Sequence, residues 1–332
     1  MTEIRTKPLY HSVRIGKVEL EGNLFLAPVA GYSDRAFRSI CWDKGASFTY
    51  TEMISAEALS RGSEKTALLM RRAHNETAYG VQIFGGSPGV MEQAARIVRE
   101  QAKPSLIDIN AGCPVPKIVK SGAGSGLTRD PETLFTVTRA VVQAASPLPV
   151  TVKIRSGWDA ANLTWKEAAL AAIEAGAAAI TLHPRTRAQG YEGKADWHLL
   201  TELTRVIRDK SGAVPVFGSG DVFSPEAAKA MLEQTGVDGV LFARGALGNP
   251  FIFRDTRELL ETGAYAPMDS AEQIAAGLKE LTLLIADTGE RRACREMRKR
   301  FCAYVKGLPD AASLRNALVA CETESDYRKL LK

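Results

Sequence analysis

The stretch Asn110-Ala111-Gly112-Cys113-Pro114 decides how the rest of the chain is interpreted, because it ends the fourth of eight short apolar runs. Each run closes on a group capable of chemistry or of binding. The runs end near positions 28, 51, 84, 110, 154, 183, 219 and 243. A parallel barrel gathers such groups at the carboxyl ends of its strands, where its active site lies. The pattern therefore predicts a (β/α)8 TIM barrel.

Helical periodicity fills the gaps between these runs, and each gap is long enough for the crossover that two parallel neighbours need. Pro88, Pro131 and Pro225 stand at or near the expected starts, where the missing N–H of proline is harmless. Residues 164–167 have the form of a capping box. An open doubly wound sheet would have similar strands, but the count of eight runs favours a closed barrel. Six helices are expected, over residues 34–44, 88–100, 131–144, 164–175, 197–210 and 224–234.

The two ends of the chain add elements to this barrel. Residues 13–20 alternate about Gly16, which predicts a hairpin that plugs the barrel floor. A single barrel takes roughly 250 residues, and the chain has 332. We therefore expect a catalytic barrel domain over residues 1–255 and a small all-helical domain over residues 256–332. Four tail helices are expected, from Ser270 with a capping box, over residues 290–306, from Asp310 and from Thr323.

The composition, with 45% hydrophobic and 24% charged residues, is that of an ordinary globular protein. A net charge of +5 is too small to indicate nucleic acid by itself. The five cysteines show no metal-ligand spacing, which argues for reduced thiols and against a zinc site. Residues 1–10 show no secretory signal, and the longest apolar stretch, 168–182, is broken by Glu174 and Gly176. We expect a cytoplasmic monomer that binds neither membrane nor metal.

Cys113 lies in a loop rather than on an apolar periodic face, which weakens the alternative of a buried structural cysteine. Loop residues held by a rigid scaffold often carry function. A free thiol has a pKa of about 8.5 and is mostly protonated at neutral pH, which suits a proton donor better than a nucleophile. The loop over residues 112–127 is long and rich in glycine, as lids often are, although a plain flexible loop is the alternative.

Lys153 and His183 end adjacent strands of the predicted barrel. An unpaired lysine is costly to bury, so one interpretation of Lys153 is a salt bridge at the barrel mouth, to Glu52 or Asp108. The other is a cation that faces negative charge on a ligand, such as the pyrimidine edge of a reduced flavin. His183 is either a satisfied core histidine or, beside Arg185, a ligand contact. Two such groups on adjacent strands favour ligand contact.

Two glycine-bearing turns follow the last two runs, Gly218-Ser219-Gly220-Asp221 and Ala243-Arg244-Gly245. The loops after strands seven and eight of such barrels frequently bind phosphate through backbone N–H groups. Glycine lets the backbone approach the anion, and Arg244 adds a positive charge. Two tight turns with incidental glycines are the alternative. The position of both turns favours a ligand that carries a phosphate.

The helix expected over residues 290–306 has two chemically different sides. The apolar side consists of Cys294, Met297, Phe301, Tyr304 and Val305, and the basic side of Arg291, Arg292, Arg295, Lys299 and Lys306. A solvated surface is the ordinary interpretation of a basic face. Because this helix belongs to a tail beside a site of small-molecule size, we favour a surface that contacts RNA phosphates.

With these segments in place, the chain resembles the tRNA-dihydrouridine synthases, of the bacterial type with an Asn-x-Gly-Cys-Pro loop and a helical tail. The resemblance covers nearly the whole chain, from Leu24-Phe25-Leu26-Ala27-Pro28 to Lys306-Gly307-Leu308-Pro309. His183-Pro184-Arg185-Thr186 and Ala243-Arg244-Gly245-Ala246 belong to it, as does the Cys113 loop. This family implies a TIM barrel that binds FMN and reduces specific uridines in tRNA to 5,6-dihydrouridine with NADPH.

The resemblance also implies a role for each matching residue. The flavin ring would lie against Pro28, Val29 and Ala30, its pyrimidine edge against Gln82, and its flanks against Lys153 and His183. The phosphate end would be held by Ser219, Gly220, Asp221, Ala243 and Arg244. The proton donor would be Cys113, the uracil contacts Asn110 and Arg185, and the RNA contacts of the tail Arg291, Arg295 and Lys299.

Three positions depart from the pattern of the family. Val29 replaces the methionine usual after that proline, and Ser219 stands where asparagine is common. Arg300 occupies a place where histidine is frequent in the tail. The first two changes adjust the flavin contacts without abolishing them, and the third leaves the RNA contacts of the tail open.

In the implied reaction, a hydride passes from flavin N5 to uracil C6 while Cys113 protonates C5 from the opposite face. Two rival functions remain. One is an FMN-dependent dehydrogenase or reductase of a free pyrimidine, such as dihydroorotate or dihydropyrimidine, which needs no basic tail. The other is an RNA-binding protein with a catalytically silent barrel, which would purify without flavin.

Overall fold

The computed structural model describes residues 8–331, so most of the polar segment 1–10 lies outside the described residues. Within the described residues, the central sheet has nine parallel strands in the order β4-β3-β13-β12-β11-β8-β7-β6-β5. Their bounds are β3 Leu24–Leu26, β4 Phe48–Thr49, β5 Ile54–Ser55, β6 Gly80–Phe84, β7 Leu106–Ala111, β8 Val150–Arg155, β11 Ala179–His183, β12 Val216–Ser219 and β13 Gly239–Phe242.

These strands form the eight positions of a closed barrel, because β4 and β5 are two parts of one position. β4 pairs with β3, β5 pairs with β6, and between them Tyr50 forms a parallel bridge with Gly80. The Thr51 N–H donates to the Gly80 carbonyl at 2.9 Å. Nearly every strand residue is buried, as expected of a parallel sheet covered by helices. The predicted (β/α)8 barrel is confirmed.

Strand register places several predicted site residues side by side. Asn110 of β7 is paired with Lys153 of β8, and His183 of β11 is paired with Arg155 of β8. Because parallel strands end at the same edge of a sheet, these side chains reach one rim of the barrel. The rim therefore collects groups that lie far apart in the sequence.

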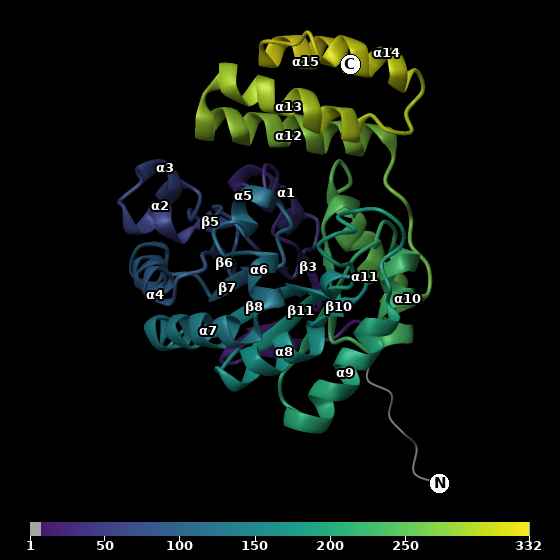
Figure 1. Ribbon diagram of the computed structural model, residues 1–332. Coiled ribbons are helices and arrows are strands. Elements are labelled where there is room, and N and C mark those ends of the chain that lie inside the picture. Colours follow the sequence, from purple (N-terminus) through teal and green to yellow (C-terminus); the bar gives the residue numbers. More distant parts are fainter. Residues whose placement is uncertain (1–7, 332) are drawn as a thin grey trace.

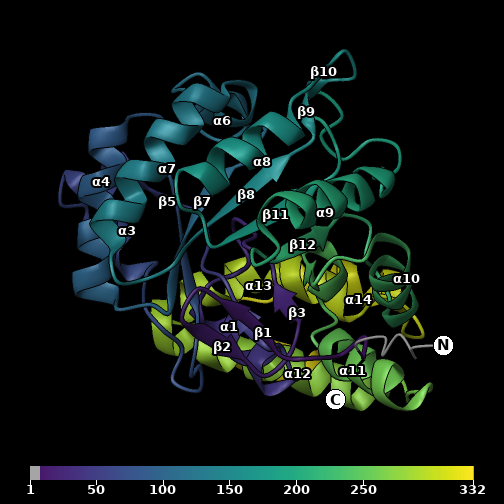
Figure 2. The ribbon, with the colours of Figure 1, turned by 90° about the horizontal axis from the view of Figure 1, so that it is seen from below.

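Helices surround the strands (Figure 2). The six predicted between strands are α1 Arg35–Asp43, α4 Pro88–Ile97, α7 Pro131–Ala145, α8 Trp165–Glu174, α9 His198–Ser211 and α10 Pro225–Thr235. α4 continues into a π-helical turn, η1 Val98–Ala102, and α11 Ile252–Thr262 packs against α10. Shorter elements follow the strand ends: α2 Ala56–Ser60, α3 Glu64–Leu68, α5 Pro116–Val119, α6 Ser125–Arg129, β9 Gly157–Asp159, β10 Asn162–Leu163 and η2 Arg244–Ala246.

Two predicted capping boxes were wrong. Thr164 is the N-cap residue of α8, as expected, but its side chain makes no capping hydrogen bond, and its hydroxyl donates to the Thr128 carbonyl at 2.7 Å. The capping box of the first tail helix is formed by Asp269 and Glu272, one position before the box predicted from Ser270. Aspartate and serine cap helices about equally well, so cap preference alone does not distinguish these adjacent candidates.

β1 Val13–Ile15 and β2 Val18–Leu20 form the predicted antiparallel hairpin, with Gly16 at φ +56° in its turn. Its buried side chains join a core cluster with Phe25 and other residues from inside the barrel. A Cβ on Gly16 would stand 2.9 Å from Pro149, which directly precedes β8. The hairpin therefore closes the barrel at the amino ends of the strands, as predicted.

The tail helices lie together at one end of the molecule, away from α7, α8 and α9 (Figure 1). They are α12 Ser270–Thr288, α13 Glu290–Tyr304, α14 Ala311–Leu318 and α15 Glu324–Leu330. Their apolar residues form a separate core cluster, which also takes in Ala36, Ile40 and Phe251 from the barrel. The predicted boundary after residue 255 falls inside α11, and the division into domains over 1–255 and 256–332 stays a prediction.

Within residues 8–331, no helix is long and apolar enough to cross a membrane. The same residues contain no group of three or more His, Cys, Asp or Glu side chains that could hold a metal ion. The five cysteines are free thiols, as predicted.

Candidate active site

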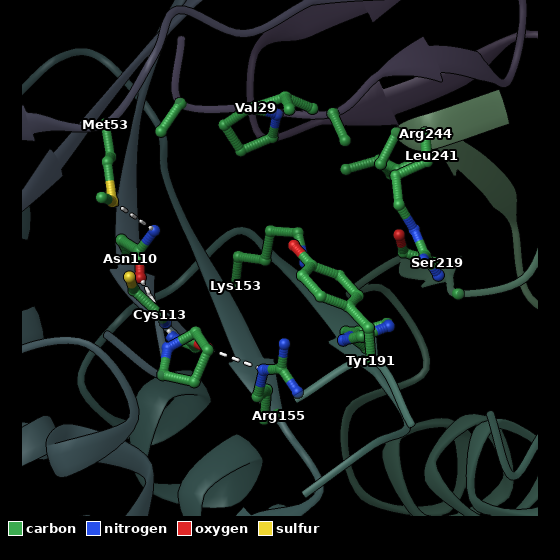
Figure 3. Close-up of a pocket in the computed structure, with 18 of the residues that line it drawn as sticks. Val29, Met53, Asn110, Cys113, Lys153, Arg155, Tyr191, Ser219, Leu241 and Arg244 are labelled. Carbon is green, nitrogen blue, oxygen red and sulfur yellow. Dashed lines mark hydrogen bonds between the residues drawn. The ribbon is translucent and has the colours of Figure 1, made fainter. Parts of the chain in front are cut away.

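A cavity of about 280 Å³ opens at the carboxyl ends of the barrel strands (Figure 3). The predicted site residues in its wall are Pro28, Val29, Ala30, Asn110, Cys113, Lys153, His183, Ser219, Gly220, Asp221, Ala243 and Arg244. The cysteine and the glycine-bearing turns thus meet in one cavity. The predicted residues that lie outside its wall are Gln82, Arg185, Arg291, Arg295 and Lys299.

One side of the cavity is a thiol wall, which consists of Met53, Asn110, Gly112 and Cys113 (Figure 3). Asn110 Oδ1 accepts the Gly112 N–H at 3.1 Å and the Cys113 N–H at 2.9 Å. This side-chain-to-backbone pattern turns the chain just after β7. The Cys113 carbonyl in turn accepts the Ser125 N–H at 2.9 Å. Hydrogen bonds therefore hold both the N–H and the carbonyl of Cys113.

The loop over residues 112–127 contains the short helices α5 and α6 and packs tightly under Cys113. Gly124 has φ +60°, and a Cβ there would stand 2.6 Å from the Cys113 carbonyl oxygen. Only glycine allows both this conformation and this close approach. The loop therefore packs against Cys113 and supports it, which the alternative of a plain flexible loop would not require.

The Cys113 thiol has the properties of a proton donor. Burial raises its pKa, and the Val115 N–H and the Arg155 guanidinium oppose this rise only in part. The thiol is therefore protonated at neutral pH. Because Cys113 is half-buried and lines the cavity, its proton can reach a ligand bound there. These are the properties of a general acid rather than of a nucleophile.

A chain of hydrogen bonds runs beneath the thiol wall and ends at the Cys113 loop. Asp108 Oδ1 accepts the Thr151 hydroxyl at 2.5 Å, and Asp108 Oδ2 accepts Gln82 Nε2 at 2.6 Å. Gln82 Oε1 then accepts Asn110 Nδ2 at 2.8 Å. Because an ionised carboxylate can only accept, Asp108 orients the Gln82 amide, and Gln82 in turn orients Asn110.

Gln82 is fully buried in this chain, one layer behind Asn110 and outside the cavity wall. Its predicted contact with the pyrimidine edge of a flavin stays a prediction. Burial raises the pKa of Asp108 to about 6, although the hydrogen bonds from Thr151 and Gln82 and the charge of Lys153 oppose this. The sequence did not show that Gln82 lies beneath the wall, because this depends on the strands that flank β6.

Lys153 and His183 line the cavity from the adjacent strands β8 and β11. Burial lowers the pKa of Lys153 to about 8, with repulsion from Arg155 added, while Asp108 opposes the shift. Within residues 8–331 no carboxylate lies at ion-pair distance from Lys153, so the alternative of a salt bridge to Glu52 or Asp108 was wrong. Burial, followed by repulsion from Lys153, lowers the pKa of His183 well below its ordinary value, so the imidazole is neutral at pH 7.

Across the cavity lies an anion wall (Figure 3), which consists of Ser219, Gly220, Asp221, Ala243 and Arg244. Gly220 has φ +108°, and a Cβ there would stand 2.8 Å from the His183 ring. Glycine is therefore required at this position, where the backbone passes close to the His183 ring.

Asp221 connects the two arginines of this side of the barrel. Its Oδ2 accepts from Arg185 at 2.8 Å and from the Ala195 N–H at 2.8 Å, and its Oδ1 lies 3.5 Å from Arg244. Burial alone would raise the pKa of Asp221, but the hydrogen bonds from Arg185 and Ala195 hold it below its ordinary value. Asp221 thus stays ionised and engaged with Arg185. Arg244, with one long contact to it, is available to an anionic ligand.

Arg185 itself is buried behind the anion wall rather than exposed in it. Its guanidinium donates to the carbonyls of Glu192 and Gly193 as well as to Asp221. Its Nη1 has no hydrogen-bond partner within the described residues. Arg185 therefore shapes the wall from behind, and its predicted contact with the uracil stays a prediction.

Sequence reasoning missed Arg155, which lines the cavity and joins two of its loops. Its guanidinium donates to the Gly112 carbonyl at 2.9 Å and to the Gly190 carbonyl at 2.9 Å. A signal for it was present, because Arg155 follows Lys153 by two positions, and such residues point to the same face of a strand.

Three further residues in the cavity wall were not singled out either, namely Met53, Tyr191 and Phe223. Arg244 lies over the Tyr191 ring at 4.4 Å and over the Phe223 ring at 5.1 Å from the centroids. Both aromatic residues lie in loops, where no periodicity marks the direction of a side chain. The sequence carried no usable signal for them.

The predicted RNA contacts lie away from the cavity, on the exposed side of α13. Arg291, Arg295 and Lys299 are all exposed. The opposite side is buried, as predicted, and consists of Cys294, Met297, Phe301, Tyr304 and Val305. A role of the exposed side in RNA binding stays a prediction.

Comparisons with known proteins identify relatives over nearly the full length. Residues 25–332 match the family model described as "Dihydrouridine synthase (Dus)". The chain is 57% identical over 303 residues to the "Probable tRNA-dihydrouridine synthase" of Treponema pallidum (strain Nichols), a match that covers 90% of this chain and 89% of that protein. It is 39% identical over 316 residues to "tRNA-dihydrouridine synthase B" of Pseudomonas putida, which covers 94% and 90%, respectively.

Solved structures share the fold at much lower identity. A histamine dehydrogenase from Rhizobium sp. 4-9 superposes with a TM-score of 0.58 at 15% identity, over 83% of this chain and 51% of that chain. A morphinone reductase in complex with tetrahydroNAD gives a TM-score of 0.52 at 14% identity, over 81% of this chain and 94% of that chain. These likenesses concern the fold alone, and they agree with the barrel.

Proposed function

The chain belongs to the dihydrouridine synthase family, and we propose that it reduces specific uridines in tRNA to 5,6-dihydrouridine, with FMN as cofactor and NADPH as reductant. The observation that carries this proposal is a protonated thiol and an anion wall on opposite sides of one cavity. A phosphate-bearing cofactor requires the anion wall, and the saturation of a carbon–carbon bond requires a proton source.

The donor set of the cavity fits FMN. The apolar side chains of Val29, Met53 and Leu241 line the cavity and can cover a flat ring. Lys153 brings a cation to the same space, as an electron-rich pyrimidine edge requires. The anion wall adds the backbone of Gly220, which no side chain of its own covers, and the guanidinium of Arg244, and both suit a phosphate.

We assign the cofactor contacts on this basis. The ring would be held by Pro28, Val29 and Ala30, its flanks by Lys153 and His183, its pyrimidine edge by Gln82 acting through Asn110, and its phosphate by Ser219, Gly220, Asp221, Ala243 and Arg244.

When bound, FMN supplies the hydride that saturates the uracil C5–C6 bond. Cys113 donates the proton to C5, and the raised pKa of its thiol keeps that proton in place at neutral pH. Asn110 holds the Cys113 loop in position and lies beside it in the thiol wall, where the uracil is expected. Lys153, which has no carboxylate at ion-pair distance within residues 8–331, would offset the negative charge that develops on the ligand.

A uridine inside a folded tRNA must leave its base stack to reach a cavity of this kind. The exposed side of α13, with Arg291, Arg295 and Lys299, would bind phosphate groups of the RNA around that uridine. Arg185 would support the anion wall from behind through its hydrogen bonds to Gly193 and Asp221. Because one chain supplies both walls of the cavity, we propose that the protein acts as a monomer. We also propose that it acts in the cytoplasm.

The alternative, reduction of a free pyrimidine, is separated from this function by one assay. The purified chain is incubated with FMN, NADPH and an unmodified tRNA transcript, and in parallel with free uridine nucleotides and orotate. Dihydrouridine at discrete tRNA positions, mapped by mass spectrometry, together with unreacted free pyrimidines, supports the proposal. Reduction of a free pyrimidine without any product in the tRNA would reject it.

A further inference from the structure

The tail touches the barrel at the turn over residues 28–34, which follows β3. Val29 and Ala30 of this turn line the active-site cavity. Its last residue, Asp34, lines a second cleft of about 730 Å³, whose walls come from the barrel and from α12 and α13. The turn is therefore the partition between the active site and the tail.

Hydrogen bonds between Val29 and the residues Tyr32 and Ser33 close the turn. Val29 accepts the N–H groups of Tyr32 at 3.0 Å and of Ser33 at 2.9 Å, and the Val29 N–H donates to Ser33 Oγ at 2.9 Å. Gly31 lies at the tip with φ +76°, and no atom stands within 4 Å of where its Cβ would be. No backbone hydrogen bond within the turn uses the N–H or the carbonyl of Gly31, so both can accept partners from outside the turn.

Two charged side chains supply these partners, one from the barrel and one from the tail. Glu52, which follows β4, accepts the Gly31 N–H at 2.5 Å. Arg300 of α13 donates through Nη2 to the Gly31 carbonyl at 3.2 Å and to Asp34 Oδ2 at 2.5 Å. Asp34 also caps α1, since its Oδ1 accepts the Phe37 N–H at 3.0 Å. A tail residue thus holds both the tip and the end of the turn.

Arg300 is itself fixed in place. It is only 5% exposed, and its Nη1 donates to Glu280 Oε1 at 2.7 Å. Glu280 is oriented in turn by the Tyr304 hydroxyl, which donates to Oε2 at 2.6 Å. Next to it on the helix, Lys299 stands 4.4 Å from the centroid of the Tyr32 ring. The planar fork of a guanidinium suits this arrangement, because its five donors serve several acceptors at once.

We propose that Arg300 is a positioning residue for the flavin site, which sets the shape of the turn that carries Pro28, Val29 and Ala30 by holding Gly31 and Asp34. The inference rests on the proposed function, since it places FMN against this turn. α13 then has two separate tasks. Its exposed side contacts RNA, and its buried Arg300 maintains the cofactor site of the barrel.

The test is the affinity of the full-length chain for FMN in the absence of RNA, measured by flavin fluorescence and paired with a melting curve. Arg300→Lys keeps a positive charge between Asp34 and Glu280 but loses the planar fork. We expect its FMN dissociation constant to rise about tenfold well below the melting transition, as for the loss of one hydrogen bond to a charged group. The visible spectrum of the bound flavin shifts with it.

Two further variants locate the effect. Arg298→Ala is the matched control on the same helix, because Arg298 binds the Cys321 carbonyl at 3.0 Å and Glu322, both within the tail. Its FMN affinity is expected to remain that of the wild type. Glu52→Ala removes the barrel-side partner of Gly31, and we expect a loss of FMN affinity similar to that of Arg300→Lys.

Unchanged FMN affinity in Arg300→Lys overturns the inference, and so does an equal loss in Arg298→Ala, because that loss would report only the stability of the tail. Should Arg300→Lys fail to fold, Glu52→Ala decides, and unchanged affinity there also overturns the inference. A wild-type chain that binds no FMN would instead refute the proposed function, so the two failures are distinguishable.

Discussion

The thiol wall and the anion wall face each other across one cavity, yet they are organised by different interactions. At the thiol wall, a series of hydrogen bonds runs from the buried carboxylate of Asp108 through Gln82 and Asn110 to the Cys113 loop. At the anion wall, Asp221 lies between the guanidinium groups of Arg244 and of the buried Arg185. We call the series of hydrogen-bonded amides at the thiol wall the amide relay, and the ion pairs at the anion wall the ion network.

This difference indicates that the two walls have different roles. An amide has a donor end and an acceptor end, so a relay of amides fixes the direction of each group and the place of the thiol. Charges act over longer distances and with less directionality, so an ion network attracts and retains an anionic ligand. Changes in the thiol wall should therefore affect chemistry, and changes in the anion wall should affect cofactor affinity.

The largest expected effect is that of Cys113→Ala. We expect dihydrouridine formation in tRNA to fall by roughly 10²- to 10⁴-fold, the usual contribution of a positioned general acid. FMN binding and flavin reduction by NADPH should stay unchanged, which absorbance measurements check separately from mass spectrometry of the tRNA. Cys302→Ala, at a half-buried cysteine of α13, is the control. An undiminished yield in Cys113→Ala would remove this thiol from the mechanism.

Arg244→Ala tests the other wall. We expect the FMN dissociation constant to rise about 10- to 100-fold, because a hydrogen bond to a charged group contributes about 1.5–3 kcal/mol. At saturating FMN the rate of product formation should remain close to that of the wild type. Arg96→Ala, at an exposed arginine paired with Glu92 on α4, is the control. Normal FMN affinity combined with a collapsed rate would contradict the assignment of a phosphate site to this wall.

Asp108→Asn tests the buried end of the amide relay through its pH dependence. Burial raises the pKa of Asp108 from an ordinary 3.8 to about 6, so the folded chain binds this proton more tightly than the unfolded chain does. Ionisation of Asp108 therefore costs the wild type stability as pH rises from about 4 to about 6. The free energy of unfolding of Asp108→Asn, relative to wild type, should rise by up to about 3 kcal/mol over that interval. Urea unfolding at several pH values measures this, and a flat difference would contradict the shifted pKa.

The smallest expected effect lies outside both walls. Arg295→Ala should weaken tRNA binding severalfold and reduce the slope of log affinity against log salt by about 1, as for the loss of one phosphate contact. FMN affinity should not change. Titrations of labelled tRNA at several salt concentrations check this, with Lys210→Ala, an exposed lysine on α9, as the control. An identical slope in both variants would mean that Arg295 does not contact the RNA.

The fold was largely predictable, and the strands show why. In β7 and β8 apolar residues alternate with polar ones such as Asp108, Asn110 and Lys153, and turn residues bound both strands, a pattern from which strands can be predicted. Their predicted ends, at positions 110 and 154, lie within one residue of the observed ends. Helix caps were less predictable, because aspartate and serine cap helices about equally well, and Asp269 and Ser270 are adjacent in the sequence.

In the candidate site, the cavity residues that could be predicted were those at or near the ends of strands. Cys113, Lys153 and Arg244 were predicted because they follow apolar runs, and all three line the cavity. Gln82 also ends a run, but it is buried beneath the wall, because its amide is bound by Asp108 and Asn110 from the neighbouring strand. Tyr191 reaches the cavity from a loop, where sequence offers no periodicity.

The amino-acid sequence by itself determined that this chain is a barrel with its chemistry on one rim, because strand and helix periodicity are local properties. Only the tertiary structure decided which polar side chains face the ligand and which orient their neighbours. Arg300 is the clearest case. Periodicity assigns it to α13, but its role depends on Gly31 and Asp34, more than 260 residues earlier, which only the packing of the tail on the barrel brings within hydrogen-bond distance.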